Sequence, residues 1–222
     1  MSFTGFPDEG LVFYEGLEAD NSKTYWMQHK ADWEAHVRAP FQALLDELAP
    51  VFGVVKIFRP YRDVRFSADK TPYKTHQGAS VRSEDAGVLG AWYVQISADG
   101  LRVAGGVWRL ESDQVARYRR AVADGVQGPR LAAEVQRLSA AGYGIGGDRL
   151  TRPPKGFDVD DDARADLLLH KSLSAHQQWE PAEWLHEREA LDRVRTAWRE
   201  FVPLNRWLAD NVGPTSKEIR RR

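Results

Sequence analysis

The sequence predicts an α+β protein in which an antiparallel sheet packs with several helices, and long helices lie near both ends of the chain. Two regions carry apolar residues at helical intervals, one before Gly53 and one after Arg109. Between them, several short segments are rich in β-branched and aromatic residues, which is typical of strands. Asp99-Gly100 separates two of these segments and is a common turn signal in β-hairpins.

The region before Gly53 is expected to form two or three helices. Pro7 suits the first turn of one helix, and Ser22 or Asn21 can cap the next. Pro40 should kink this second helix or start a new segment. The buried face of the second helix is predicted to carry residues at intervals of three, four and seven: Trp26, Trp33, Val37, Phe41, Leu44 and Leu48.

The predicted strands cover residues 54–58, 91–97 and 101–108, with the segment between the first two as an irregular insertion. After them, Ser112 is expected to cap a helix that ends near Gly125. Pro129 is expected to begin another helix that ends at Gly142. The remaining elements are predicted as a short helix over 160–169, a strand over 171–179, and a long final helix over 183–208 with a kink at Pro203.

Composition sets outer limits on the class of protein. The chain has 222 residues, of which 42% are hydrophobic, enough for a substantial core. We expect one domain over residues 1–214 and a frayed basic tail over 215–222. No apolar run approaches the roughly 18 residues that span a bilayer, and the start resembles no signal peptide, so we expect no membrane association and a cytoplasmic location. The absence of cysteine excludes disulfides and thiolate sites.

The most informative segment is RPYRDVRFSADKTPYKT, residues 59–75. It contains five basic residues and two acidic ones in a chain of net charge -1. Its basic residues are Arg59, Arg62, Arg65, Lys70 and Lys74, interleaved with Tyr61, Phe66 and Tyr73. Guanidinium and ammonium groups gathered in this way are typical of sites that hold phosphate or carboxylate.

The prolines and the turn at 67–69 predict a constrained loop. If residues 62–66 are extended, Asp63, Arg65 and Ser67 share a polar face, where Asp63 would orient an arginine and Ser67 would donate a hydrogen bond. Tyr73 would cover the ligand. The alternative is an internal network of Arg and Asp that fastens a long loop, since such networks also cluster charges. The candidate ligand-binding residues are Arg62, Asp63, Arg65, Ser67, Lys70, Tyr73, Lys74, Arg119 and Lys171.

Other motifs are weaker. The glycine-rich run 142–147 lacks the strand before it and the helix after it that a dinucleotide-binding loop needs, so we expect no cofactor. His186-Glu187 lacks the second histidine of a zinc-protease helix, and His170 and His176 would lie about 20 Å apart at about 3.3 Å per residue. The run Asp158, Asp160, Asp161 and Asp162 is expected to cap a helix. We therefore expect no metal site.

The segment 62–75, RDVRFSADKTPYKT, resembles the signature of a bacterial and fungal family known as domain of unknown function 2461. Similarity continues along nearly the whole chain, at Phe3-Thr4-Gly5-Phe6, Asn21, Trp26, Pro40, Tyr93, Gly105-Gly106, Trp108, Arg119, Pro154-Lys155-Gly156-Phe157, Leu168 and Lys171. The resemblance implies a soluble, single-domain α+β protein. It supplies no catalytic residues.

Three functions are compatible with these residues. The first is binding of an anionic small molecule by the basic segment, joined by Arg119 and Lys171. The second is a nucleic-acid module, which a sequence pI near 6.6 and the net charge of -1 make less favourable. The third is a structural protein in which the basic segment is an internal staple. The sequence leaves open whether the protein is an enzyme, and it leaves the oligomeric state open.

Overall fold

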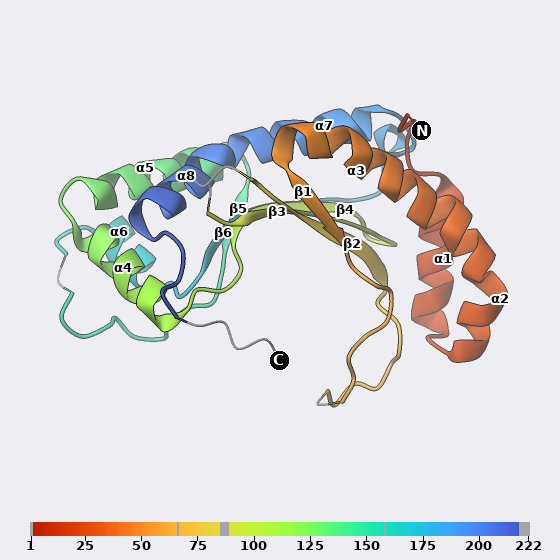
Figure 1. Ribbon diagram of the computed structural model, residues 1–222, viewed down its shortest axis with the longest axis horizontal. Coiled ribbons are helices and arrows are strands. Elements are labelled where there is room, and N and C mark those ends of the chain that lie inside the picture. The colour runs from red at the N-terminus through yellow and green to blue at the C-terminus, as the bar shows by residue number, and fades with distance from the viewer. Residues whose placement is uncertain (1, 66, 85–88, 158, 218–222) are drawn as a thin grey trace. The chain divides into compact units, whose positions relative to one another are not determined.

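The computed structural model describes residues 2–65, 67–84, 89–157 and 159–217. It confirms the α+β class (Figure 1), with a six-stranded antiparallel sheet in the order β1-β2-β3-β4-β6-β5. The strands are β1 (Val54–Ile57), β2 (His76–Arg82), β3 (Ala91–Ser97), β4 (Gly100–Val107), β5 (Gly144–Gly146) and β6 (Leu173–Trp179). The turn at Ala98-Asp99 joins β3 to β4 where the Asp99-Gly100 signal predicted a hairpin.

The chain forms two compact units, each assembled from three stretches of sequence. The first comprises Met1–Arg82, Tyr93–Val103 and Gln178–Ala197, and the second comprises Ser83–Trp92, Ala104–Gln177 and Trp198–Arg222. Strands β3 and β4 therefore contribute residues to both units. That residues 1–214 behave as one domain stays a prediction.

Four consecutive helical segments begin the first unit: α1 (Asp8–Ala19), α2 (Lys23–Trp33), a π-helix (Glu34–Arg38) and α3 (Ala39–Phe52). Helix α1 contacts α2 and the π-helix, and α3 contacts β1 and β2 (Figure 1). Ser22 caps α2 as predicted, because its hydroxyl accepts a hydrogen bond from the Tyr25 N–H at 3.1 Å. A Cβ at Gly10 would lie 2.6 Å from the His36 carbonyl oxygen, so glycine permits α1 to approach the π-helix.

Pro40 explains where α3 begins. Proline has no N–H to donate within a helix, and it occupies the first turn of α3, where that donor has no partner in any case. The π-helix lies immediately before this turn. Apolar residues on both sides of this boundary are buried, including Val37 and Phe41, so the predicted apolar stripe continues across it.

The second unit holds α4 (Ser112–Ala123), α5 (Gln127–Ala140), α6 (Asp162–Leu168) and α8 (Val202–Asn211). Helix α5 contacts α4, α6, α8 and β5. The interior between these elements is formed by buried side chains that include Tyr118, Val122, Leu131, Leu138, Leu167, Phe201, Leu204 and Leu208. Glycine is required in β4, where a Cβ at Gly106 would lie 2.4 Å from the Leu173 carbonyl oxygen.

Several predicted boundaries were wrong. The final helical region is divided into a 3₁₀ helix (Glu183–His186), α7 (Glu189–Glu200) and α8, because Pro203 falls in the first turn of a new helix. Strands β2 and β5 were not predicted. Helix α4 is capped by Glu111 rather than Ser112, in a capping box with Gln114.

None of the helices in the described part of the chain has both the length and the apolar character needed to cross a membrane. At the other end of the chain, the predicted tail begins with residues in contact with α4. Thr215 Oγ1 donates to Asp113 Oδ1 at 2.8 Å, and the Ser216 N–H donates to Asp113 Oδ2 at 2.9 Å. Residues 218–222 of the predicted tail lie outside the described residues.

Candidate functional site

Residues 59–75, here called the basic hairpin, form a long connection between β1 and β2 that extends beyond the ends of both strands (Figure 1). Its two arms pair through an antiparallel bridge between Tyr61 and Tyr73. The Arg62 N–H donates to the Pro72 carbonyl, and the Lys74 N–H donates to the Pro60 carbonyl, both at 2.8 Å. The described residues of the two arms therefore extend the pairing of β1 with β2. Phe66 lies outside the described residues.

The base of the basic hairpin is fastened to α2 and to the turn before it. The Asn21 side chain makes two 3.0 Å hydrogen bonds to the main chain of Tyr73, one to its N–H and one to its carbonyl. The Tyr73 ring stacks on Trp26 with centroids 4.5 Å apart and is 5% exposed. Tyr73 thus packs in the interior of the first unit.

The acidic residues of the basic hairpin each bind an arginine. Asp63 accepts two hydrogen bonds from the Arg65 guanidinium, at 2.9 and 2.7 Å. Asp69 pairs with Arg62, which also donates to the Thr71 hydroxyl. Hydrogen bonds from the Arg65 side chain lower the pKa of Asp63 to about 2, and those from the Thr71 N–H and Arg62 lower the pKa of Asp69 to about 2.

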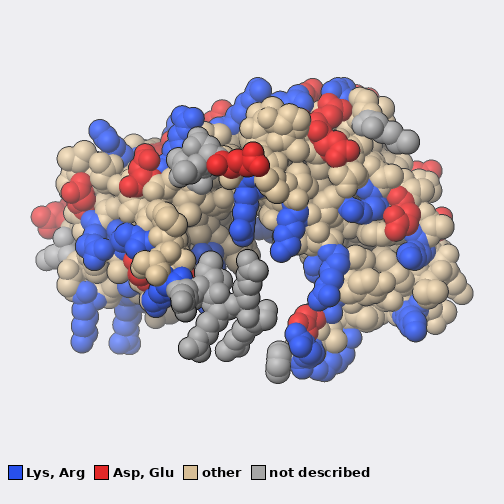
Figure 2. Space-filling model, in the orientation of Figure 1, with Lys and Arg blue, Asp and Glu red and all other residues tan. Residues whose placement is uncertain are grey.

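The two lysines donate to main-chain carbonyls of the same hairpin. Lys70 Nζ lies 3.0 Å from the Val64 oxygen, and Lys74 Nζ lies 3.1 Å from the Arg59 oxygen. Burial, followed by the nearby Arg59 charge, lowers the pKa of Lys74. Figure 2 shows basic side chains gathered at the hairpin tip with acidic ones among them. Hydrogen-bond donors of four side chains are therefore already paired with acceptors inside the hairpin: Arg62, Arg65, Lys70 and Lys74.

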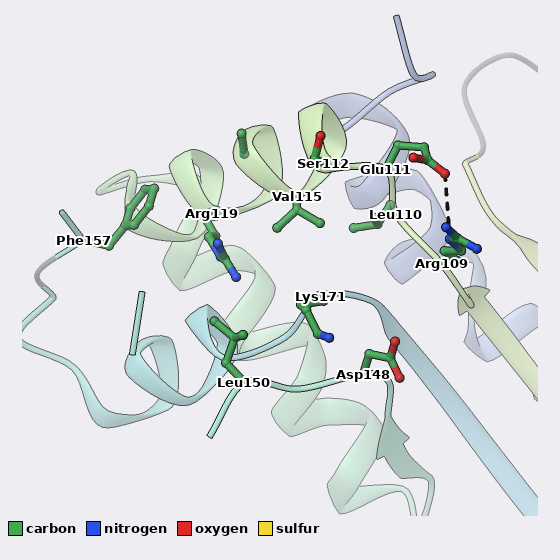
Figure 3. Close-up of a pocket in the computed structure, with 11 residues that line it drawn as sticks. Arg109, Leu110, Glu111, Ser112, Val115, Arg119, Asp148, Leu150, Phe157 and Lys171 are labelled. Carbon is green, nitrogen blue, oxygen red and sulfur yellow. Dashed lines mark ion pairs between the residues drawn. The ribbon is translucent and has the colours of Figure 1, made fainter. Parts of the chain in front are cut away.

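A pocket of about 770 Å³ lies within the second unit, open to solvent (Figure 3). One wall is a face of α4, where Ser112, Val115, Ala116 and Arg119 follow one another at helical spacing. The full lining is Arg109, Leu110, Glu111, Ser112, Val115, Ala116, Arg119, Asp148, Leu150, Phe157 and Lys171. It gathers residues from before α4, from α4 itself, and from the chain on both sides of α6.

The opposite wall consists of two short segments that pair with each other. The Lys171 N–H donates to the Asp148 carbonyl and the Leu150 N–H donates to the Leu169 carbonyl, both at 2.7 Å. Because side chains alternate along extended chain, Asp148 and Leu150 face the same side. In Figure 3, Arg119 and Val115 project from α4 toward this wall, and Lys171 points toward Asp148.

Contacts between α6 and α4 hold the two walls together. The Arg164 side chain donates to the carbonyls of Val122 and Ala123, at 3.1 and 2.6 Å, so it satisfies acceptors at the C-terminal end of α4. The Tyr118 hydroxyl donates to the Leu167 carbonyl at 3.0 Å. These buried or partly buried hydrogen bonds thus hold α6 against α4.

Arg119 differs from the other charged groups of this pocket in having a buried donor that is unpaired within the described residues. Its Nε is buried and has no hydrogen-bond partner, and no ion pair to its guanidinium occurs within the described residues. Lys171 is exposed, and within the same part of the chain its ammonium forms no hydrogen bond or ion pair. Arg109, by contrast, lies 3.8 Å from Glu111. With Asp148 included, the lining carries three basic and two acidic groups.

The family model of the conserved hypothetical proteins described as DUF2461 matches residues 9–207. The chain belongs to this family. A search of curated proteins found no match. The family membership predicted from the basic segment and the scattered motifs is therefore confirmed. The matched residues of this DUF2461 protein extend over both units.

The nine predicted ligand-binding residues of the DUF2461 protein form two groups. Arg62, Asp63, Arg65, Ser67, Lys70, Tyr73 and Lys74 belong to the basic hairpin of the first unit. Arg119 and Lys171 belong to the second unit and line its pocket together. That the two groups act on one ligand stays a prediction.

The sequence did not single out the apolar part of the pocket. Val115 and Leu150 resemble ordinary core positions, and no local pattern distinguishes them. Phe157 carried a signal, because it ends the Pro154-Lys155-Gly156-Phe157 motif through which the chain resembles the family. Arg109 and Asp148 carried none, since isolated charged residues are common on surfaces.

The remaining motifs have structural roles. The Asp161 carboxylate accepts from the Arg164 N–H at 2.7 Å and caps α6, as expected for the acidic run, although Asp158 lies outside the described residues. The glycine-rich run contributes β5. In the part of the chain that the structure describes, no three His, Asp or Glu residues gather as a metal site would require. His170 is buried, and burial lowers its pKa.

Proposed function

We propose that this DUF2461 protein binds a small molecule bearing phosphate or carboxylate in the pocket beside α4. Arg119 would hold the anionic group, and Lys171 would turn from Asp148 to meet it. A guanidinium presents N–H groups in a planar fork that matches both kinds of anion, while a lysine side chain is flexible enough to adjust.

The observation that carries this proposal is the unpartnered, buried Nε of Arg119. A buried donor without an acceptor costs about 1–3 kcal/mol of folding free energy. Such unpaired donors are rare in native proteins, and a functional site is one reason for their presence. The Nε is closed to solvent as it stands, so the guanidinium would turn toward the pocket and an oxygen of the bound anion would then supply the missing acceptor. The pocket is large enough for an organic ligand, since about 770 Å³ falls in the usual range for such sites.

The resemblance of the chain to its family also supports a site in the pocket beside α4. Arg119, Phe157 and Lys171 come from separate segments through which the chain resembles the family, and all three line this pocket. Their shared location suggests that the resemblance in these segments concerns one site.

For the basic hairpin we favour the structural role that the sequence left as an alternative. Arg62 and Arg65 have carboxylate partners in the hairpin, Lys70 and Lys74 donate to its carbonyls, and Tyr73 is buried. The same contacts leave fewer free cations for nucleic-acid phosphates. A ligand on the hairpin would have to compete with these partners.

The test is a thermal-shift screen against phosphate, sulfate, sugar phosphates, nucleotides, carboxylates and short single-stranded DNA. A ligand that binds the folded state raises its melting temperature by mass action. We expect a shift in the wild type that disappears in Arg119→Met and weakens in Lys171→Met. Loss of charge-assisted hydrogen bonds worth about 1.5–3 kcal/mol each lowers affinity roughly tenfold to a hundredfold.

Two controls locate the site. Arg130→Met removes an exposed arginine of α5 in the same unit but outside the pocket lining, so it should bind like the wild type. The double variant Lys70→Ala/Lys74→Ala should also keep the shift. If the double variant loses the shift while Arg119→Met retains it, the anion binds the basic hairpin and the proposal is wrong.

A further inference from the structure

The pocket beside α4 has an apolar side as well as a charged one. Leu110, Val115, Ala116, Leu150 and Phe157 contribute to its lining. Figure 3 shows Arg119 between Phe157 and Val115 along the α4 wall, with Leu150 projecting from the opposite wall. Apolar side chains therefore lie on both sides of Arg119 along the α4 wall.

From this arrangement we infer that the ligand is an organic anion whose charged group is attached to an apolar, preferably aromatic, group. The inference rests on the proposed function, because it places the anionic group at Arg119. The attached group would lie against Phe157, Val115 and Leu150, where it removes apolar surface from water.

Inorganic anions and sugar phosphates fit this pocket less well. Their hydroxyl and phosphate oxygens would face the Phe157 ring and the Val115 and Leu150 methyl groups, which offer no hydrogen bonds. An aromatic group would instead pack on the Phe157 ring in an offset or edge-to-face arrangement. Ligand sites in general combine such apolar walls with a few placed polar groups.

The position of Phe157 also favours a recognition role over a core role. It is only partly buried, in a connection between β5 and α6, whereas Tyr118 on α4 of the same unit is 0% exposed. Removing its ring should therefore affect the pocket more than the fold.

The experiment compares methyl phosphate with phenyl phosphate, at a pH at which both are dianions, by isothermal titration calorimetry. The two esters share the charged group and differ in the apolar one. We expect the wild type to bind phenyl phosphate about tenfold more tightly than methyl phosphate. This ratio corresponds to the free energy gained when part of an aromatic ring is buried. In Phe157→Ala the tenfold difference between the two esters should disappear.

Trp108→Ala is the matched control. Trp108 is an aromatic residue of the same unit, 86% exposed and outside the pocket lining, so its removal should leave the tenfold preference intact. Val115→Thr provides a second variant of nearly the same shape on α4, and it should reduce the preference even if Phe157→Ala proves unstable.

The outcomes separate this inference from the proposed function. Equal binding of both esters by the wild type, with Arg119→Met unable to bind either, would overturn the inference and leave the anion site in place. A preference that survives both Phe157→Ala and Val115→Thr, or that Trp108→Ala abolishes, would also overturn it. Failure of the wild type to bind either ester, or any anion of the thermal-shift screen, would contradict the proposed function as well.

Discussion

At the scale of single residues, Arg119 and Arg65 show why a charged side chain must be judged by its partners. Arg65 is 76% exposed, yet its guanidinium makes a two-point contact with Asp63. Arg119 is less exposed, and its Nε has no partner within the described residues. The sequence placed both among the candidates, because residue type and spacing reveal charge but not pairing.

Removing the Arg119 charge should make the protein without ligand at least as stable as the wild type. Methionine keeps much of the side-chain volume and eliminates the buried donor, a change that relieves a cost of about 1–3 kcal/mol. Urea unfolding of Arg119→Met and wild type in the absence of anions measures the difference. A clear loss of stability in the variant would mean that the guanidinium is satisfied by an interaction within the fold.

Asn205 gives a second test at this scale. It is 0% exposed on α8, and among the described residues neither its amide nitrogen nor its amide oxygen has a hydrogen-bond partner. Replacement by leucine, of similar size, should raise the free energy of unfolding by about 1–2 kcal/mol because no polar group is then buried unpaired. Asn205→Asp should be strongly destabilising. If Asn205→Leu lowers the unfolding midpoint, a bound water satisfies the native amide.

At the scale of elements, the basic hairpin depends on its base more than on its exposed cations. Asn21→Ala removes two hydrogen bonds to the Tyr73 main chain and leaves those groups partly buried, so we expect a loss of about 1–3 kcal/mol. Lys70→Ala removes one exposed hydrogen bond and should cost less than about 1 kcal/mol.

Thermal unfolding of the two variants, each compared with the wild type, shows which substitution lowers the stability more. A larger loss in Lys70→Ala than in Asn21→Ala would contradict the account of how the hairpin is held. Both variants should retain anion binding in the thermal-shift screen, since neither residue lines the pocket.

Sequence patterns predicted elements well where a local rule dominated. Ser22 capped its helix and the Asp99-Gly100 signal marked a hairpin. Strand β2 was missed because HQGASVR lacks an alternation of apolar and polar residues, and its Gln77 is buried with its amide donating to the Phe58 and Gly78 carbonyls. Such long-range satisfaction of a polar side chain leaves no trace in the local sequence.

At the scale of the whole molecule, the α+β class and the family were both predictable, since they depend on patterns spread along the entire chain. The division into two units was not, because it assigns parts of β3 and β4 to different units. Of the pocket beside α4, the sequence analysis singled out only Arg119 and Lys171, and it grouped them with the basic segment. Its walls come from segments up to about sixty residues apart, which no local pattern connects.

Global stability should fall in acid partly through Glu47. Its carboxylate accepts from Arg188 Nη1 at 2.8 Å and from the Phe3 N–H at 2.9 Å, and these hydrogen bonds, the Arg188 side chain first, lower the pKa of Glu47 to about 2. Since the folded pKa lies below the ordinary value of 4.5, this stabilisation is present above pH 4.5 and is lost as the pH falls toward 2.

We expect the unfolding midpoint of the wild type to drop across this pH window more steeply than that of Glu47→Gln. Denaturant unfolding at a series of pH values measures both. Glu9→Gln, which changes an exposed glutamate that forms no ion pair within the described residues, should follow the wild type. Parallel curves for all three proteins would mean that the Glu47 contacts do not contribute in solution.

The most direct test of the account is the location of a bound oxyanion in a crystal. Tungstate mimics phosphate and scatters anomalously, so an anomalous difference map from soaked crystals of the wild type reveals its position. We predict a tungsten peak in the pocket beside α4, placed so that a tungstate oxygen lies within hydrogen-bond distance of the Arg119 guanidinium, and no such peak in crystals of Arg119→Met. A peak on the basic hairpin with none beside α4 would contradict the proposed site.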